Sequence, residues 1–290
     1  MLGRSNAESP RFASTMTSVR PSHGLALAVV FVVAISVLSA ASLWMLLGQS
    51  LHNHSPLSDV ISDREFWQSA KRTLIFAISA VILKAVLAWL LVPYFYRHGD
   101  RIITSLLLIP WVVPTSVAAI AWLWFFYDVG GGANSILAPI RVDWLGNPRS
   151  AFGITLAFNV WRETPLWALA LASSLSGGRA ALSRLAQLDG LSRLEHFRLV
   201  ALPRVLPVLC ALALLSTIWA VGEFETVWLL TQGGPGEATE LLAVYAFKHA
   251  YLSQDLAFGV ASYLCMFPII FCILLPALRL YRRAVERASL

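Results

Sequence analysis

Residues 101–128, RIITSLLLIPWVVPTSVAAIAWLWFFYD, contain no charged side chain between Arg101 and Asp128. A helix needs about 20 apolar residues to cross the roughly 30 Å hydrocarbon core of a bilayer. Buried helices of soluble proteins are shorter, about 10–14 residues on average. A charge-free run of this length therefore predicts a membrane span over residues 102–127.

Five more apolar runs of comparable length lie on either side of this one. Together the six predicted spans cover residues 24–47, 73–96, 102–127, 151–174, 205–230 and 256–278. Buried helices of a soluble core do not explain six such runs in one short chain. The sequence therefore predicts an all-α integral membrane protein with six transmembrane helices, in a transmembrane domain over residues 24–280.

The composition agrees with this prediction. Of the 290 residues, 58% are hydrophobic and 13% are charged, and the mean hydropathy is +0.69. Soluble domains carry about 25% charged residues. The composition excludes a disordered chain, a soluble enzyme of ordinary composition and a nucleic-acid-binding module. The sequence pI of 9.5 then reflects topology, because basic residues accumulate on the cytoplasmic side of membrane proteins.

The first run raises a second possibility, since a basic residue followed by apolar and then small residues is also typical of a signal peptide. The apolar core of a signal peptide has about 7–15 residues, and the run over residues 24–47 is longer. We therefore expect a retained span, preceded by a cytoplasmic tail over residues 1–23. Met1 and Met16 are both candidates for the true start.

An even number of spans places both termini on one side of the membrane. The distribution of basic residues indicates which side that is. That side also holds the 97–101 turn and the 175–204 loop. The opposite side carries few of the 22 lysine and arginine residues, namely Arg64, Lys71, Arg72, Arg141, Arg149 and Lys248. By the positive-inside rule the richer side is cytoplasmic. We therefore expect a multi-pass protein of the cytoplasmic (inner) membrane with both termini inside, including a tail over residues 281–290.

Residues 175–204, LSGGRAALSRLAQLDGLSRLEHFRLVALPR, form one long cytoplasmic loop. Apolar residues recur at helical spacing up to Gly190, a residue suited to a helix C-terminus. Ser192 and Glu195 then fit a capping box that starts a second helix, and Pro203 suits the first turn of the fifth span. The pattern indicates either an amphipathic linker on anionic lipid or a docking surface for a cytoplasmic partner.

The second half of this loop resembles the EAA loop of ABC importer permeases. That motif runs roughly Glu-Ala-Ala, two residues, Asp-Gly, then phenylalanine, a β-branched residue and Leu-Pro. The chain keeps the matching spacing at Asp189, Gly190, Phe197, Leu202 and Pro203. In that family the loop forms a coupling helix that inserts into a groove of the ATPase subunit. The resemblance implies the fold of a type I ABC importer permease and an ATPase-coupling role for these residues.

The head of the motif departs from the family. Arg184 stands where the family has glutamate, Leu185 stands where it has the first alanine, and Ala186 is kept. We expect these residues to take part in ATPase coupling. The reversed charge implies that the ATPase supplies a carboxylate to Arg184, or that a sister permease carries the stronger contact.

A second resemblance lies in a segment predicted to be outside. Residues 231–236, TQGGPG, are similar to the external Thr-x-Gly-Gly-Pro segment of carbohydrate-importer permeases, specifically the first of two subunits of the maltose and glycerol-phosphate type. Gly233, Gly234 and Pro235 carry this match. A Gly-Gly-Pro run alone indicates any tight turn, but the resemblance covers about residues 70–285. It implies import of a sugar or sugar derivative whose identity stays open.

Energy for transport is expected from partner subunits. A P-loop needs a Gly-Lys step to cradle phosphates, and none of Lys71, Lys84 and Lys248 follows a glycine. We find no catalytic constellation and no metal-ligand spacing, so we expect no enzyme, no cofactor and no metal site in this chain. The resemblance implies two ATPase subunits that bind ATP and Mg, a second homologous permease and an extracytoplasmic solute-binding protein. Membrane lipid is the remaining partner, and alternating access is the implied mechanism.

Charged residues within spans cost about 3 kcal/mol each near the bilayer centre, so each needs an explanation. Lys84 is either buried against a carboxylate or carbonyl groups, or a donor in the substrate path. Arg162 and Glu163 are adjacent and so point to different faces of a helix; they either bond neighbouring spans or line the path. Glu223 lies near the outer end of the fifth span, in a solvated interface or in the path.

Aromatic rings stack on sugar faces, and polar groups bind sugar hydroxyls. The substrate-pathway candidates are Lys84, Asn159, Trp161, Arg162, Glu163, Trp219 and Glu223. An alternative function is an ion-coupled secondary transporter that uses Lys84 and Glu163 as coupling charges. Such transporters usually show an internal repeat, and we see none between residues 24–127 and 151–278.

Two prolines, Pro110 and Pro114, interrupt the backbone ladder of the third predicted span. Such interruptions are tolerated where neighbouring helices satisfy the freed carbonyl groups. They indicate either a static kink or a flexible point in gating.

Overall fold

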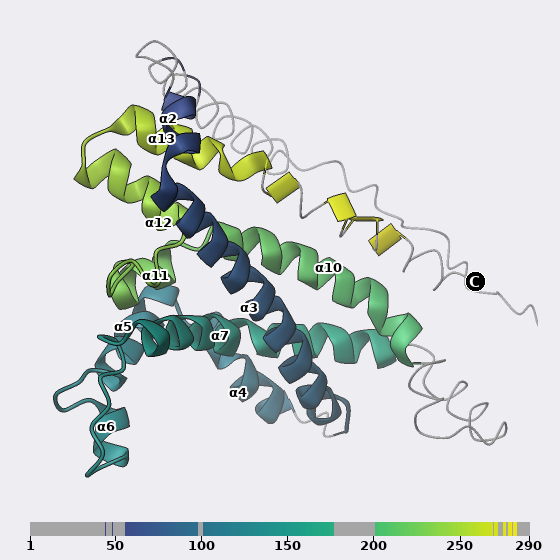
Figure 1. Ribbon diagram of the computed structural model, residues 1–290. Coiled ribbons are helices and arrows are strands. Elements are labelled where there is room, and N and C mark those ends of the chain that lie inside the picture. Colours follow the sequence, from purple (N-terminus) through teal and green to yellow (C-terminus); the bar gives the residue numbers. More distant parts are fainter. Residues whose placement is uncertain are drawn as a thin grey trace, which may run out of the picture. The chain divides into compact units, whose positions relative to one another are not determined.

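The fold is given by a computed structural model of the chain. It describes residues 56–97, 101–176 and 201–268, together with Trp44, Gly48 and part of residues 270–282. The chain divides into two units, Met1–Gly48 and Gln49–Leu290, and the helical packing belongs to the second. Every regular element in the described part is helical, and no strand occurs there (Figure 1). The predicted all-α class is thereby confirmed.

The described part of the chain forms the following helices. In chain order they are α2 (Pro56–Ser62), α3 (Arg64–Arg97), α4 (Arg101–Val112), α5 (Thr115–Phe125), α6 (Gly132–Ile136), α7 (Pro148–Ser176), α10 (Leu202–Val221), α11 (Glu225–Thr231), α12 (Leu242–Phe247), the π-helix η2 (Lys248–Leu252) and α13 (Leu256–Leu264).

Three long helices, α3, α7 and α10, pack against one another, and α4 packs against α7 (Figure 1). The buried face of α3 carries small residues at helical spacing, Ala77, Ala80 and Ala88, and Ala168 is buried on α7. Small side chains let helix backbones approach closely in a membrane, where no hydrophobic effect drives helices together. The opposite face of α3 exposes large apolar residues such as Ile78 and Ile82, as a helix facing lipid or another subunit does.

Among the described residues, two helices are long and apolar enough to cross a bilayer, Arg64–Phe95 and Leu202–Val221. A third span is possible if the bent pair Thr104–Val112 and Thr115–Phe125 is taken as one. The predicted span over residues 24–47 lies outside the described residues except for Trp44, and that over 256–278 is described only in part, from α13 onward. The count of six spans therefore stays a prediction.

The third predicted span is broken rather than kinked. α4 ends at Val112, α5 begins at Thr115, and the two axes differ by 92°. Pro114 lacks a backbone N–H and disfavours helical geometry at the preceding residue, and it takes an extended conformation with φ −53° and ψ 135°. Pro110 lies inside α4 and does not end it.

The fifth predicted span is also interrupted. α10 ends at Val221, and α11 begins at Glu225 after a short irregular stretch over residues 222–224. α11 packs against α5 and α7, so the second half of each broken span contacts the other. The predicted span over residues 205–230 thus corresponds to two helices.

A hydrophobic cluster joins α3 to the elements that follow α11. Phe66 and Phe76 of α3 pack with Val227, Leu242 and Tyr245, all of them buried. α13 packs against α2, α12 and η2. This cluster fixes the segments that connect α11 with the last helix.

The packing of α13 against η2 has a point where a single methyl group does not fit. A Cβ atom added at Gly259 would lie 2.5 Å from the Cβ of Ala250 and 2.8 Å from the carbonyl oxygen of Ala246. We expect Gly259→Ala to lower the thermal unfolding temperature of the purified protein, because overpacking costs about 1–3 kcal/mol.

Gly153→Ala is the matched control, because a Cβ atom added there has no atom within 4 Å. Alanine also favours a helix over glycine by about 1 kcal/mol, so this variant should unfold at the same or a higher temperature. Equal unfolding temperatures for the two variants would contradict the packing described for Gly259.

Candidate functional site

Lys84 of α3, Glu163 of α7 and Ser216 of α10 meet in the middle of the three-helix packing. The Nζ atom of Lys84 donates to Oε2 of Glu163 at 2.6 Å and to Oγ of Ser216 at 2.9 Å. The hydroxyl of Ser216 lies 3.2 Å from the same carboxylate oxygen. The three residues are 0%, 3% and 1% exposed.

The position of Lys84 follows from the sequence of α3. It lies four residues from both Ala80 and Ala88, on the small-residue face that packs against α7. An isolated charge in such a place costs far more than a paired one. Of the two explanations that the sequence left open for Lys84, the structure shows burial against a carboxylate, and the sequence did not predict which one.

Arg162 points away from its neighbour Glu163, as the helical geometry predicts. Its Nη1 atom donates to Oγ1 of Thr115, the first residue of α5. The guanidinium group thereby reaches the break between α4 and α5. Glu163 and Arg162 together bond α7 to α3, α10 and α5.

Asn159 and Glu223 form a second polar contact between α7 and the break after α10. Nδ2 of Asn159 donates to Oε2 of Glu223 at 2.9 Å, and Oε1 of Glu223 accepts from the backbone N–H of Thr226 at 3.1 Å. Asn159 is 2% exposed, and its Oδ1 atom has no hydrogen-bond partner among the described residues. A buried acceptor without a donor costs about 1–3 kcal/mol, so this oxygen is suited to a hydroxyl or water donor.

The structure separates the tryptophan candidates. The ring of Trp161 lies 5.3 Å from that of Trp122 and 5.8 Å from that of Phe158, while 38% of the residue stays exposed. Trp161 is also next to Arg162 in sequence and two residues from Asn159. Trp219 lies on α10 with 46% of its surface exposed. The structure therefore packs Trp161 against aromatic rings of α5 and α7.

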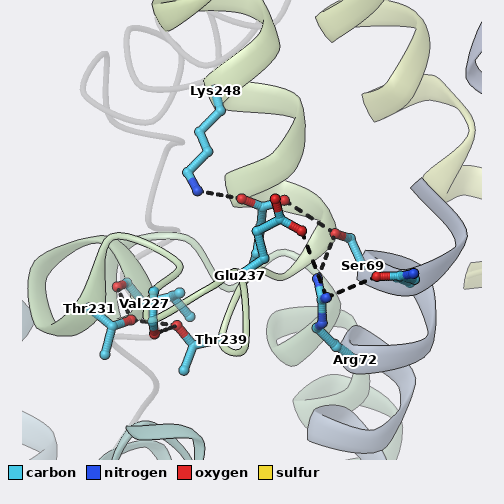
Figure 2. Close-up of polar contacts among 10 residues, drawn as sticks. Ser69, Arg72, Val227, Thr231, Glu237, Thr239 and Lys248 are labelled. Carbon is cyan, nitrogen blue, oxygen red and sulfur yellow. Dashed lines mark hydrogen bonds and ion pairs between the residues drawn. The ribbon is translucent and has the colours of Figure 1, made fainter. Parts of the chain in front are cut away.

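Residues 231–240, which are predicted to lie outside and which we call the external turn for that reason, surround Gly233, Gly234 and Pro235. Oγ1 of Thr239 donates to the carbonyl oxygen of Gly234 at 2.8 Å and lies 2.6 Å from Oγ1 of Thr231 (Figure 2). Gly233 has a φ of +86°, and a Cβ atom there would lie 3.1 Å from Nζ of Lys248. The positive φ favours glycine at this position, and an added side chain would also meet a close neighbour.

Ion pairs attach the external turn to α3 and η2 (Figure 2). Glu240 is 4% exposed, and its carboxylate accepts from Nζ of Lys248 and from Oγ of Ser69 at 3.4 Å. Nη2 of Arg72 lies 3.9 Å from Oε2 of Glu237. Sequence reasoning missed this network, because Ser69 lies 171 positions from its partner and no motif includes Glu240.

A cavity of about 570 Å³ lies beside the external turn. Its lining comes from the end of α5, the loop after it and α11, and includes Phe126, Tyr127, Asp128, Asp143 and Gln232. The side chain of Asn134 donates to the carbonyl oxygen of Val142 at 3.0 Å. This hydrogen bond joins α6 to the stretch that precedes α7. Aromatic rings beside carboxylate and amide groups suit a polar ligand with an apolar face.

The predicted coupling loop lies almost entirely outside the described residues. This holds for Arg184, Leu185, Ala186, Asp189, Gly190 and Phe197. Leu202 and Pro203 are the first residues of α10, which has proline in its first turn. The coupling role of all eight residues stays a prediction.

The ion pair between Lys84 and Glu163 generates a test. Lys84→Met leaves a buried carboxylate without its partner, which typically costs about 3–5 kcal/mol. We expect this variant to lower the thermal unfolding temperature strongly. The double variant Lys84→Met with Glu163→Leu should recover most of the loss, because buried pairs are often replaced by apolar residues at little cost.

Thermal unfolding of the purified proteins in one detergent gives the comparison. A double variant whose loss equals the sum of the losses in Lys84→Met and Glu163→Leu would show that the two residues act independently. The Glu163→Leu variant completes the cycle and isolates the coupling energy of the pair.

Known proteins of several kinds are similar to this chain. The family described as "Binding-protein-dependent transport system inner membrane component" matches residues 84–289. The trehalose/maltose transport system permease protein MalF of Thermococcus litoralis is 36% identical over 208 residues, 70% of either chain. The sulfoquinovosyl glycerol transport system permease protein SmoG of Agrobacterium fabrum is 29% identical over 220 residues, 74% of this chain and 70% of that protein.

A solved structure shares the fold. It is a bacterial alginate ABC transporter in complex with an alginate pentasaccharide-bound periplasmic protein, with a TM-score of 0.74 and 19% identity over 90% of this chain and 93% of the other. The family match covers more than half of the sequence and includes Lys84, Glu163 and the predicted coupling loop. The chain therefore belongs to the family of binding-protein-dependent transport system inner membrane components, and it is a transport subunit of ABC importers, not an enzyme.

Proposed function

We propose that this chain is the permease subunit of an ATP-driven importer that moves a sugar or sugar derivative across the cytoplasmic membrane by alternating access. The observation that carries the proposal is the family match over residues 84–289. The names of similar proteins supply the substrate class, since they refer to trehalose or maltose, sulfoquinovosyl glycerol and alginate. These compounds are carbohydrates or carbohydrate derivatives.

Six spans with both termini in the cytoplasm form the topology of this proposal. The run over residues 24–47 supplies the first span, and the excess of arginine on one side sets the orientation. The pair α4 and α5 supplies the third span, and α10 with α11 supplies the fifth. The external turn then lies outside, and the 175–204 loop lies in the cytoplasm between spans four and five.

Partner subunits complete the transporter. Two ATPase subunits bind ATP and Mg, a second homologous permease forms the other half of the pathway, and an extracytoplasmic solute-binding protein delivers the sugar. The solved alginate transporter, which holds a periplasmic protein, supports the last of these. ATP binding closes the ATPase dimer and moves the coupling loop, which opens the spans outward to accept the sugar.

The substrate path is best supported around α7. Asn159 offers a buried acceptor with no donor among the described residues, and Trp161 offers a partly exposed aromatic face. A sugar hydroxyl donates to such an oxygen, and a sugar ring stacks on such a face. Glu223 holds Asn159 by a hydrogen bond, and Arg162, the residue after Trp161, bonds Thr115 at the start of α5.

The ion-coupled alternative is not favoured. It needs Lys84 and Glu163 as groups that gain and lose an ion, whereas in the structure they neutralise each other in a buried pair with Ser216. The family to which the chain belongs takes its energy from ATP. We therefore assign these two residues a structural role in holding α3, α7 and α10 together.

Reconstitution into proteoliposomes with the partner subunits tests the proposed function. We expect uptake of a sugar that the cognate binding protein retains, chosen from a panel with trehalose, maltose and an alginate pentasaccharide. Uptake should require ATP inside and stop when the Walker A lysine of the ATPase is replaced by alanine. Uptake driven by an imposed proton or sodium gradient without ATP would overturn the proposal.

A substitution of Arg184 tests the coupling loop most directly, because the resembled family has a glutamate, of opposite charge, at this position. We expect Arg184→Glu to reduce ATP-coupled uptake by about tenfold or more while the complex still assembles, because a like charge then meets the ATPase carboxylate. Arg179→Glu, a charge reversal outside the motif, is the control and should have a smaller effect. Unchanged uptake in Arg184→Glu would argue against a specific role for this residue.

A further inference from the structure

A group of three metal-ligating side chains lies at the start of α3, apart from the residues discussed for transport. A carboxylate oxygen of Asp63, a carboxylate oxygen of Glu65 and a ring nitrogen of His249 all lie within 4.8 Å of one another. Asp63 immediately precedes α3, Glu65 is in its first turn, and His249 belongs to η2. The fold therefore brings together residues from distant parts of the sequence.

Two of the three ligands are held in place by their surroundings. Asp63 accepts the backbone N–H of Glu65 through Oδ1 at 2.9 Å and the hydroxyl of Tyr245 through Oδ2. Each carboxylate oxygen has two lone pairs, so both keep one for a cation. The His249 ring lies 4.5 Å from the ring of Tyr245 and 4.7 Å from that of Phe258. Such hydrogen bonds and packing around ligands are typical of protein metal sites.

The charge of the group also favours a cation. Lysine and arginine side chains of the described residues pair with Glu163, Glu237 and Glu240, but none pairs with Asp63 or Glu65. The two carboxylates carry two formal negative charges. A divalent cation neutralises them.

We propose that Asp63, Glu65 and His249 form a binding site for a divalent transition metal of the zinc type. One imidazole nitrogen and two carboxylate oxygens match zinc in ligand type and number, with water in the fourth position. The three atoms must draw closer to reach Zn–N and Zn–O distances of about 2.0–2.2 Å. Glu65 is exposed, so its side chain has room to rotate inward.

The bound metal would link the start of α3 to η2 and hold the two segments together. Both segments lie in the part of the chain predicted to be outside the membrane, where such a cation is accessible. The inference does not depend on which sugar is transported or on how ATP is coupled. The sequence showed no ligand spacing, because His249 joins the carboxylates only through the packing of α12 and α13 on α2 and α3.

Zinc content of the purified full-length complex, prepared without a polyhistidine tag and dialysed against zinc and then buffer, tests this site. We expect about one retained zinc ion per chain, measured by elemental analysis. Glu65→Gln and His249→Gln should each lose most of it. Asp59→Asn, which changes an exposed carboxylate of α2, should retain it.

A second measurement separates metal binding from misfolding. Zinc should raise the thermal unfolding temperature of the unaltered complex and of Asp59→Asn, and should leave that of Glu65→Gln and His249→Gln unchanged. In the absence of zinc, Glu65→Gln should unfold like the unaltered complex, because its side chain is exposed. No retained zinc in the unaltered complex, or full retention in Glu65→Gln and His249→Gln, would overturn the proposal.

Discussion

The buried pair of Lys84 and Glu163 is the constraint on which the rest of the structure depends. Neither charge is tolerated alone at that depth, so the two helices that carry them must meet in one register. Ser216 extends the requirement to α10. Apolar packing between helices in a membrane is tolerant of sliding and rotation, since lipid is as apolar as leucine. The ion pair removes that freedom and sets where every other residue of α3, α7 and α10 lies.

Polar contacts at the helix breaks also fix how neighbouring helices pack. Arg162 bonds the start of α5, and Glu223 bonds Asn159 and the N–H of Thr226 after α10. Arg162 reaches a break from within α7 and bonds a side-chain hydroxyl there. Glu223 lies in a break itself and accepts one of the backbone N–H groups that lack a partner at a helix start. The intramembrane charges thus divide into one pair that holds unbroken helices together and others that stabilise broken ones.

The helical class, the apolar runs and the glycine-rich turn at Gly233 could be predicted from the sequence, because they depend on residue types and their spacing. The partner of Lys84 could not, because Glu163 lies 79 positions away and the sequence also allowed backbone carbonyls. At Pro114 the sequence indicated a static kink or a flexible point rather than a break, and Pro93, Pro165 and Pro207 lie inside continuous helices. Proline content alone therefore does not distinguish a bend from a break.

The 92° break between α4 and α5 has a consequence for depth in the bilayer. At about 1.5 Å per residue, the 12 residues of α4 and the 11 residues of α5 each extend only about half of the roughly 30 Å hydrocarbon core. Irregular backbone at that depth is not stable against lipid. In the proposed third span, residues 113–115 must therefore be covered by protein or water on every side, so the surface around Pro114 marks a place where another helix, another subunit or the transport pathway has to lie.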